Sequence, residues 1–516
     1  MTLRRRSLLP LPLLPLLPAL PAAMSACTTP ATPPAATPQY RPAYHFTPAA
    51  HWMNDPNGLV FHQGEYHLFF QHHPGSSVWG PMHWGHATST DLLRWTEQPI
   101  ALRPDKLGMI FSGSAVVDEA NRAGFGPPGT QPLVAMFTHH DMAAEKAGRI
   151  DHQHQSLAYS LDGGQTWAPY AGNPVIPNPG RKDFRDPKLR WLPGRQRWLA
   201  SLACGDRICF YSSADLLAWT LESEFGAGLG AQGGVWECPD LLPLAGPDGR
   251  TRWVLLVSLT PGGPNGGSAT QYFVGDFDGH RFTPDDSHTR WLDFGPDNYA
   301  GLTWAGVHDR ALFIGWMSNW QYANVAPTAP WRSAMTMPRE LTLRQVAGSS
   351  WVASLPAREM LGLQQPATLD KQRVMVTDAL DLSPGLAGCQ GRFVLRLATP
   401  ALRSFEIRLA NAAGDTLGIG FDAGKACWWI DRRGSGELGF HPAFAGRHEA
   451  PRLALGSPAD LQLWLDASSV ELFADAGLSG LTSLCFPRQP WQQATLTAAG
   501  GLLLDGLSLQ PLRDPR

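Results

Sequence analysis

The feature that most constrains the fold is a short pattern that recurs four times between residues 89 and 286. Each copy has a small or polar opening, an Asp, a turn, and then Trp or Phe followed by Thr or Ala; the rings are Trp95, Trp167, Trp219 and Phe282. Runs of strand type, among them PLVAMFT, RWLASLAC and RWVLLVSL, lie between the copies. A repeated unit of four short strands is typical of a β-propeller. A fifth unit from Tyr299 to about Leu343 predicts five blades.

The repeat stops after about residue 345, and the chain of 516 residues is too long for one ordinary core. Further short strands follow, such as GRFVLRLA, SFEIRLA and ACWWIDR, a composition that suits a β-sandwich. We therefore predict an all-β protein with a five-bladed propeller over residues 44–345, a linker over 346–364 and a β-sandwich over 365–516.

The N-terminus reads as an export signal. Arg4, Arg5 and Arg6 precede a proline-interrupted apolar stretch that is too weak for a membrane span, which predicts a signal peptide over residues 1–26. The run MSAC resembles a bacterial lipoprotein cleavage site, with Cys27 as the lipidated first mature residue; ordinary cleavage nearby is the alternative. Residues 27–43 form a proline-rich spacer. The protein is expected outside the cytoplasm, as a periplasmic, cell-surface or secreted bacterial protein.

Composition excludes several partners. Charged residues make up 16% of the chain and the net charge is −3, so neither nucleic acid nor an anionic membrane surface is expected to bind; the only membrane contact expected is a lipid on Cys27.

No Cys or His spacing matches a zinc site, and His139, His140, His152 and His154 are interpreted as polar loop and strand residues. Cys204 and Cys209 flank GDRI, a spacing that leaves both a disulfide and two buried thiols open.

Asp55 in the stretch HWMNDPNG has a purely structural interpretation, because Asn-Asp-Pro and Pro-Asn-Gly are strong turn signals. Every blade, however, brings a polar group at the equivalent place, the start of its first strand, and first strands surround the central channel of a propeller. The residues at blade starts are Asp55, Ser112, Arg185 with Asp186, Glu237, and Asp297 with Tyr299. This recurrence favours an active-site role for Asp55 over a purely structural role in a turn.

Several carboxylates in one pocket with aromatic walls suit the cleavage of a glycosidic bond, which needs one carboxyl group to attack and a protonated one to release the leaving oxygen. Crowding and partial burial push the pKa values of such groups apart. Arg185, next to Asp186, is placed to hold that carboxylate ionised. Each motif alone is compatible with an ordinary turn or strand end, and only their joint placement carries the argument.

The motifs WMNDPNG, FSGS, FRDPK and ECPD, in this order, resemble those of glycoside hydrolase family 32, the invertases, inulinases and levanases. The segments around GWMSNWQY and SVELFADAG extend the resemblance over the mature chain. It implies a five-bladed propeller followed by a β-sandwich, Asp55 as nucleophile, Glu237 as general acid/base, and Asp186 as the carboxylate that holds fructose hydroxyls. Implied substrate-binding residues are Trp52, Met53, Asn54, Gln71, Trp79, Phe111, Ser112, Arg185 and Trp316. Asp297 and Tyr299 match less well, and for them a scaffold role stays open.

The resemblance implies a retaining hydrolase that needs no cofactor, with its two reactive carboxyls roughly 5–5.5 Å apart. The fifth-blade segment favours release of terminal β-D-fructose from levan or inulin, and from sucrose. A sucrose-specific invertase, an endo-acting levanase and a fructosyltransferase are the near alternatives, and a five-bladed arabinan-cleaving enzyme is a further one. A non-catalytic carbohydrate-binding propeller predicts the loss of at least one of the three acids. The sequence leaves a monomer and a homodimer equally open.

Overall fold

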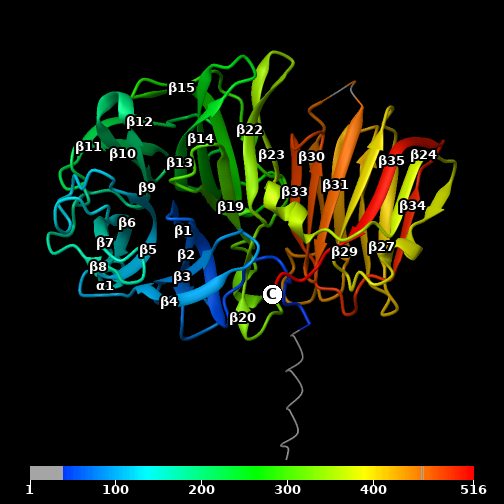
Figure 1. Cartoon of the computed structure of the whole chain (residues 1–516), viewed down its shortest axis with the longest axis horizontal. Coiled ribbons are helices and arrows are strands. Elements are labelled where there is room, and N and C mark those ends of the chain that lie inside the picture. The colour runs from blue at the N-terminus through cyan, green and yellow to red at the C-terminus, as the bar shows by residue number, and fades with distance from the viewer. Residues whose placement is uncertain (1–38, 455, 457) are drawn as a thin grey trace, which may run out of the picture. The chain divides into compact units, whose positions relative to one another are not determined.

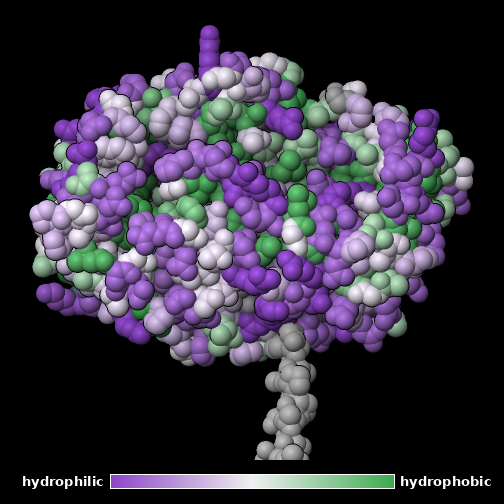
Figure 2. Space-filling model, viewed as in Figure 1, coloured by the Kyte–Doolittle hydropathy of each residue, from purple (hydrophilic) through white to green (hydrophobic). Residues whose placement is uncertain are grey.

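The computed structural model describes residues 39–454, 456 and 458–516, and its regular secondary structure is almost entirely β-strand (Figure 1). The predicted signal peptide and Cys27 lie outside the described residues. Within the described part, no helix is long and apolar enough to cross a membrane. The face in Figure 2 is mostly hydrophilic, with hydrophobic residues scattered over it.

Five antiparallel sheets form the blades, and the prediction of a five-bladed propeller is confirmed. Their strands, blade by blade, are β1 (His51–His62), β2 (Glu65–His73), β3 (His83–Ser89) and β4 (Thr96–Leu102); β5 (Met109–Val117), β6 (Leu133–His140), β7 (Gln153–Ser160) and β8 (Ala168–Pro169); β9 (Phe184–Leu192), β10 (Arg197–Cys204), β11 (Ile208–Ser213) and β12 (Thr220–Phe225); β13 (Val235–Ala245), β14 (Thr251–Thr260), β15 (Ala269–Phe277), β16 (Phe282–Pro284) and β17 (Arg290–Trp291); β18 (Tyr299–Thr303), β19 (Ala311–Met317), β21 (Ala334–Met335), β22 (Arg339–Val346) and β23 (Ser349–Pro356). Strand β20 (Trp331–Arg332) pairs in parallel with β1 and so connects the fifth blade to the first.

The recurring Asp of the sequence pattern caps the turn before the outermost strand of the first four blades. In the first blade, Asp91 Oδ1 accepts the backbone N–H groups of Leu93 and Arg94 at 2.9 and 2.8 Å. Equivalent side-chain caps are made by Asp162, Asp215 and Asp278. An Asp that bonds the backbone two to four residues on fixes such a turn, which explains why the pattern recurs.

The fifth blade extends further than the predicted boundary at residue 345. Strand β23 pairs with β22 along its whole length and is the outermost strand of the blade, although residues 346–364 were assigned to a linker. Val352, Ala353 and Ser354 of this strand are buried, so both of its faces are covered along this stretch. A 3₁₀ helix, η3 (Arg358–Leu363), completes the connection; the other 3₁₀ helices are η1 (Pro193–Arg195), η2 (Ala323–Val325) and η4 (Ser383–Leu386).

The C-terminal part consists of two six-stranded sheets that enclose one apolar core, as expected for a β-sandwich. One sheet has the order β24 (Leu369–Val376), β35 (Leu502–Pro511), β26 (Phe393–Thr399), β31 (Ala459–Asp466), β32 (Ser469–Ala474) and β33 (Ser479–Leu484). The other has the order β25 (Ala379–Asp381), β34 (Gln493–Thr497), β27 (Phe405–Ala410), β28 (Thr416–Asp422), β29 (Cys427–Gly434) and β30 (Arg447–Pro451).

Buried ion pairs link the sandwich to the propeller and to the segment before β1. Arg339 of β22 contacts both Asp293 and Glu471, and all three side chains are at most 2% exposed. His45 contacts Asp466 at 2.9 Å and Glu471 at 2.7 Å. Burial lowers the pKa of His45, but the hydrogen bonds to the two carboxylates outweigh it and raise the pKa to about 9.

Cys204 and Cys209, for which the sequence left both a disulfide and two buried thiols open, form a disulfide. Their Cα atoms are 6.2 Å apart. It joins the ends of β10 and β11 across their hairpin. Among the described residues, the other four cysteines, Cys238, Cys389, Cys427 and Cys485, are buried thiols.

Candidate active site

A β-bulge in the innermost strand of every blade is the local feature that builds the site. The pairing register with the second strand shifts twice in β1 and once each in β5, β9, β13 and β18. A bulge leaves a residue unpaired and redirects its side chain. Asp55, Ser112 and Asp186 fall inside such shifts and leave their ladders. Glu237 and Tyr299 are the last paired residues before a shift, opposite Ser258 and Trp316.

Three of these bulges hold a non-glycine residue in the left-handed region, one of them Ala300 of β18 with a φ of 53°. Asp186 has a φ of 63° and Cys238 a φ of 45°. Such conformations cost free energy and persist where the surrounding structure enforces them, often at functional sites. Asp186 and Cys238 belong to the group of side chains around Asp55 described below.

A pocket of about 410 Å³ receives these side chains. Nine of the predicted site residues line it: Asn54, Asp55, Gln71, Trp79, Phe111, Ser112, Arg185, Asp186 and Glu237. They come from blades one to four, so a single cavity collects residues that are up to 183 positions apart in the chain (54 to 237).

Asp55 is held by two donors on its two oxygens. Ser112 Oγ donates to Oδ2 at 2.6 Å and Asn54 Nδ2 donates to Oδ1 at 2.9 Å. Asn54 is itself fixed by Trp52, whose indole N–H donates to Asn54 Oδ1 at 2.6 Å. Desolvation raises the pKa of Asp55; the hydrogen bond from Ser112 opposes this and the charge of Glu237 adds to it.

Asp186 and Asp55 both lie close to the Cys238 thiol. The Cys238 backbone N–H donates to Asp186 Oδ2 at 3.1 Å, and its sulfur lies 3.7 Å from that oxygen and 3.6 Å from Asp55 Oδ2. Burial raises the pKa of Asp186, the Arg185 guanidinium lowers it, and the neighbouring carboxylates of Glu237 and Asp55 raise it. The carboxylates of Asp186 and Asp55 thus lie close enough to repel each other.

Both oxygens of Glu237 are engaged. Arg185 Nη2 donates to Oε1 at 2.9 Å, and the buried Tyr299 hydroxyl donates to Oε2. The same guanidinium contacts Asp183 Oδ1 at 2.7 Å, so Arg185 is itself oriented. Desolvation and the nearby Glu237 raise the pKa of Tyr299 well above its ordinary value, which keeps the hydroxyl a donor.

Four predicted binding residues stand behind the pocket wall. Trp52, Met53 and Trp316 are fully buried, and the Trp316 indole donates to the Met53 carbonyl at 3.1 Å. Tyr299 reaches the site only through its hydroxyl on Glu237. These side chains position the residues that line the pocket.

Asp297 does not belong to the pocket, and its assignment as a substrate-binding residue is corrected. Its carboxylate is fully buried and accepts from Arg432 Nη1 of the sandwich at 2.6 Å, from Tyr322 Oη at 2.6 Å and from Leu484 N at 2.9 Å. Of the two roles that the sequence left open, the scaffold role fits these contacts.

Six residues of the pocket were not predicted as site residues: His140, Glu145, Gln153, Asp183, Trp320 and Asn324. Trp320 stacks on Trp52 with ring centroids 5.9 Å apart, and Asn324 accepts the Trp79 backbone N–H at 2.9 Å. They lie outside the motifs at blade starts. Two of them carried a signal in the sequence: Asp183 directly precedes FRDPK, and Trp320 lies within GWMSNWQY.

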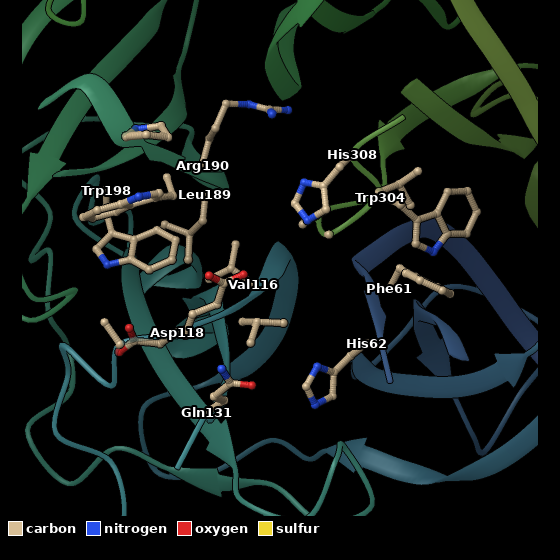
Figure 3. A pocket seen from close by; sticks show the side chains of 18 of the residues that line it. Phe61, His62, Val116, Asp118, Gln131, Leu189, Arg190, Trp198, Trp304 and His308 are labelled. Atoms are coloured by element: carbon tan, nitrogen blue, oxygen red, sulfur yellow. The ribbon is translucent and has the colours of Figure 1, made fainter. Parts of the chain in front are cut away.

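A larger pocket of about 720 Å³ lies at the opposite ends of the inner strands (Figure 3). Its two carboxylates are those of Asp118 and Glu119. Asp118 is buried and accepts the backbone N–H of Ala123 at 2.9 Å, and of the motif residues only Lys188, the last residue of FRDPK, lies there. The smaller pocket holds Asp55, Asp186 and Glu237 with their donors, and also Glu145 and Asp183, and is therefore the candidate active site. The described residues contain no cluster of three or more His, Cys, Asp or Glu that could hold a metal ion.

The family models for the N-terminal and C-terminal domains of glycosyl hydrolases family 32 match residues 45–353 and 362–510. The chain belongs to this family, and it is a glycosidase.

Relatives of known activity cover most of the chain. A levanase of Bacillus subtilis is 44% identical over 487 residues, spanning 92% of this chain and 70% of the levanase. The extracellular exo-inulinase of Aspergillus niger is 42% identical over 502 residues, spanning 90% and 93% of the two chains.

Solved structures show the same fold. The crystal structure of an exo-inulinase from Aspergillus awamori matches with a TM-score of 0.84 and 37% identity, covering 93% of this chain and 99% of that one. A fructofuranosidase of Schwanniomyces occidentalis in complex with fructosylnystose matches with a TM-score of 0.84 and 33% identity, covering 92% and 98%.

Proposed function

We propose that this protein is a retaining β-fructofuranosidase that releases terminal β-D-fructose from levan and inulin, and also cleaves sucrose. The observation that carries the proposal is the placement of Asp55, Asp186 and Glu237 around one pocket, each with its own donors. The names of the levanase and exo-inulinase relatives support the substrate class.

In the first step, Asp55 attacks the anomeric C2 of the fructosyl unit. The C2–O bond to the leaving sugar breaks, and the proton carried by Glu237 goes to the departing oxygen. A covalent fructosyl ester on Asp55 results. The donors Ser112 and Asn54 leave Asp55 little rotational freedom, so its oxygen is fixed before substrate arrives.

In the second step, Glu237 takes a proton from water, and the hydroxide attacks C2 to release fructose and free Asp55. Two inversions give net retention of configuration. Arg185 stays on Glu237 through both steps and neutralises its carboxylate form. Asp186, held by the Cys238 backbone N–H, accepts fructose hydroxyls and offsets the positive charge that develops on the ring.

A time course of products on levan, inulin and sucrose tests the proposal. The volume of about 410 Å³ suits one or two sugar rings and supports cleavage at a chain end. Free fructose without intermediate oligosaccharides is the expected result. Early oligosaccharides would indicate an endo-acting enzyme, larger oligosaccharides from sucrose a fructosyltransferase, and turnover of sucrose alone an invertase.

We further propose export by the signal peptide over residues 1–26 and a lipid on Cys27, supported by the sequence pattern and by the extracellular exo-inulinase relative. Mass spectrometry of the mature N-terminus tests both. An acylated Cys27 is expected, and an unmodified N-terminus elsewhere would contradict the anchor. The sequence predicts either a monomer or a homodimer, and analytical ultracentrifugation distinguishes the two by mass.

A further inference from the structure

The loop between β6 and β7 places a carboxylate in the pocket that the proposed mechanism does not use. Residues Met142–Lys146 of this loop form the short helix α1. Asp141 caps it, with Oδ1 accepting the N–H groups of Ala143 and Ala144 at 3.0 Å each. The cap fixes Glu145, which lines the pocket together with Arg185 and Glu237.

A chain of hydrogen bonds determines which nitrogen of His140 carries the proton. Gln153 Oε1 accepts the backbone N–H of Phe184 at 2.8 Å, so the amide nitrogen of Gln153 faces His140 Nδ1 at 3.2 Å. An amide nitrogen only donates, hence Nδ1 accepts and Nε2 carries the proton. His140 Nε2 then donates to Glu145 Oε2 at 3.1 Å.

The His140 ring has little freedom to depart from this arrangement. It stacks on Phe111, with ring centroids 4.3 Å apart and an interplanar angle of 7°. Burial lowers the pKa of His140, which favours the neutral ring that the hydrogen bonds require. A neutral donor therefore orients Glu145. Because the His140 ring is uncharged, it does not neutralise the negative charge of Glu145.

One oxygen of Glu145 stays available to a ligand. The side chain is 45% exposed, and no described residue donates to Oε1. The residues that hold Asp55 lie deeper, with Asn54 at 3% and Ser112 at 4% exposure. Glu145 thus stands at the mouth of the pocket, beyond the place of the fructosyl unit that Asp55 attacks.

The part of a substrate that reaches this mouth is the sugar on the leaving side of the bond. Its hydroxyls are neutral donors, and a carboxylate is a strong acceptor for them. We propose that Glu145 binds hydroxyls of the leaving sugar, the glucosyl unit of sucrose or the next fructosyl unit of a fructan, and that His140 is its positioning residue. This inference rests on the proposed function.

The test compares substrates with and without a leaving sugar. Sucrose carries one, whereas methyl β-D-fructofuranoside releases methanol. Glu145→Gln is expected to lower the ratio of kcat/KM for sucrose to that for the methyl fructoside about tenfold or more, the effect of losing a hydrogen bond to a charged group. Lys146→Gln, on the exposed neighbour in the same helix, is the matched control and is expected to keep both values.

A ratio within twofold of the wild type in Glu145→Gln, with an unchanged melting temperature, would overturn the inference. His140→Phe keeps the stacking on Phe111 but removes the donor, so it should lower the same ratio. Combined with Glu145→Gln it should add little, because both changes remove one interaction; full additivity would contradict the positioning role. If the wild type releases fructose from neither substrate, the proposed function fails instead.

Discussion

Replacing Asp55 by Asn should abolish activity while leaving the fold intact or more stable. Desolvation raises the pKa of Asp55 in the folded protein, so the folded state favours the protonated form. At pH values below the unfolded pKa of about 3.9, the carboxyl group is protonated in both states and the raised pKa does not lower the free energy of unfolding. The loss of free energy of unfolding appears as the pH rises through the folded pKa. At neutral pH the ionised carboxylate therefore lowers the free energy of unfolding.

Asn has the same shape without the charge, and the Ser112 hydroxyl can turn to donate or accept. We expect a gain of about 0.5–2 kcal/mol in the free energy of unfolding, the usual size when a functional site is relieved of its strain. Loss of the nucleophile should lower kcat by about 10⁴-fold or more. Fructose release from sucrose measures the loss of activity. Urea unfolding followed by tryptophan fluorescence measures the change in the free energy of unfolding.

Two further variants make the result interpretable. Asp55→Ala cannot revert by deamidation and should be equally inactive. Asp118→Asn makes the same change at a buried carboxylate that lines the larger pocket, and it should retain near-normal kcat. The reasoning is refuted if folded Asp55→Asn keeps more than about a tenth of the wild-type kcat, or if its free energy of unfolding falls by several kcal/mol.

Three other changes have defined outcomes. Tyr299→Phe removes the hydroxyl donor to Glu237 and should lower kcat/KM by about 10- to 100-fold with an unchanged urea midpoint; a near-normal rate would contradict that contact. Arg432→Met strands the buried Asp297 carboxylate and should cost about 3–5 kcal/mol of unfolding free energy, whereas a loss under about 1 kcal/mol would refute the scaffold role. The stability that His45 contributes is fully present below its ordinary pKa of 6.5 and is lost as pH rises through its folded pKa of about 9, so His45→Gln should flatten the pH dependence of unfolding in that window; an unaltered slope would contradict it.

The propeller was predictable because its determinants are local and repeated. Turn-capping Asp residues such as Asp91 and Asp215 act within three residues of themselves, so their pattern is visible in the chain. The blade starts were equally visible, because the bulges at Asp55 and directly after Glu237 coincide with short motifs. The outermost strand of the fifth blade was missed because no such cap marks its turn.

The rest of the site depends on contacts that no local pattern encodes. Glu145 enters the pocket because a capped helix in a loop of the second blade points that way, and the sequence gives the loop no motif. Asp297 sits two residues before Tyr299, yet a buried Arg432 from the sandwich draws its carboxylate away. Trp316 was expected to touch substrate, but its indole is committed to the Met53 carbonyl.

The most direct test of the account is to identify the residue that carries the sugar. A Glu237→Gln variant, given a fructoside with a leaving group that needs no protonation, should form the covalent intermediate faster than it hydrolyses it. Peptide mass spectrometry should then find one fructosyl unit on the peptide that contains Asp55, attached at that side chain. A fructosyl unit on Asp186, or steady release of fructose with no modified peptide, would contradict the account.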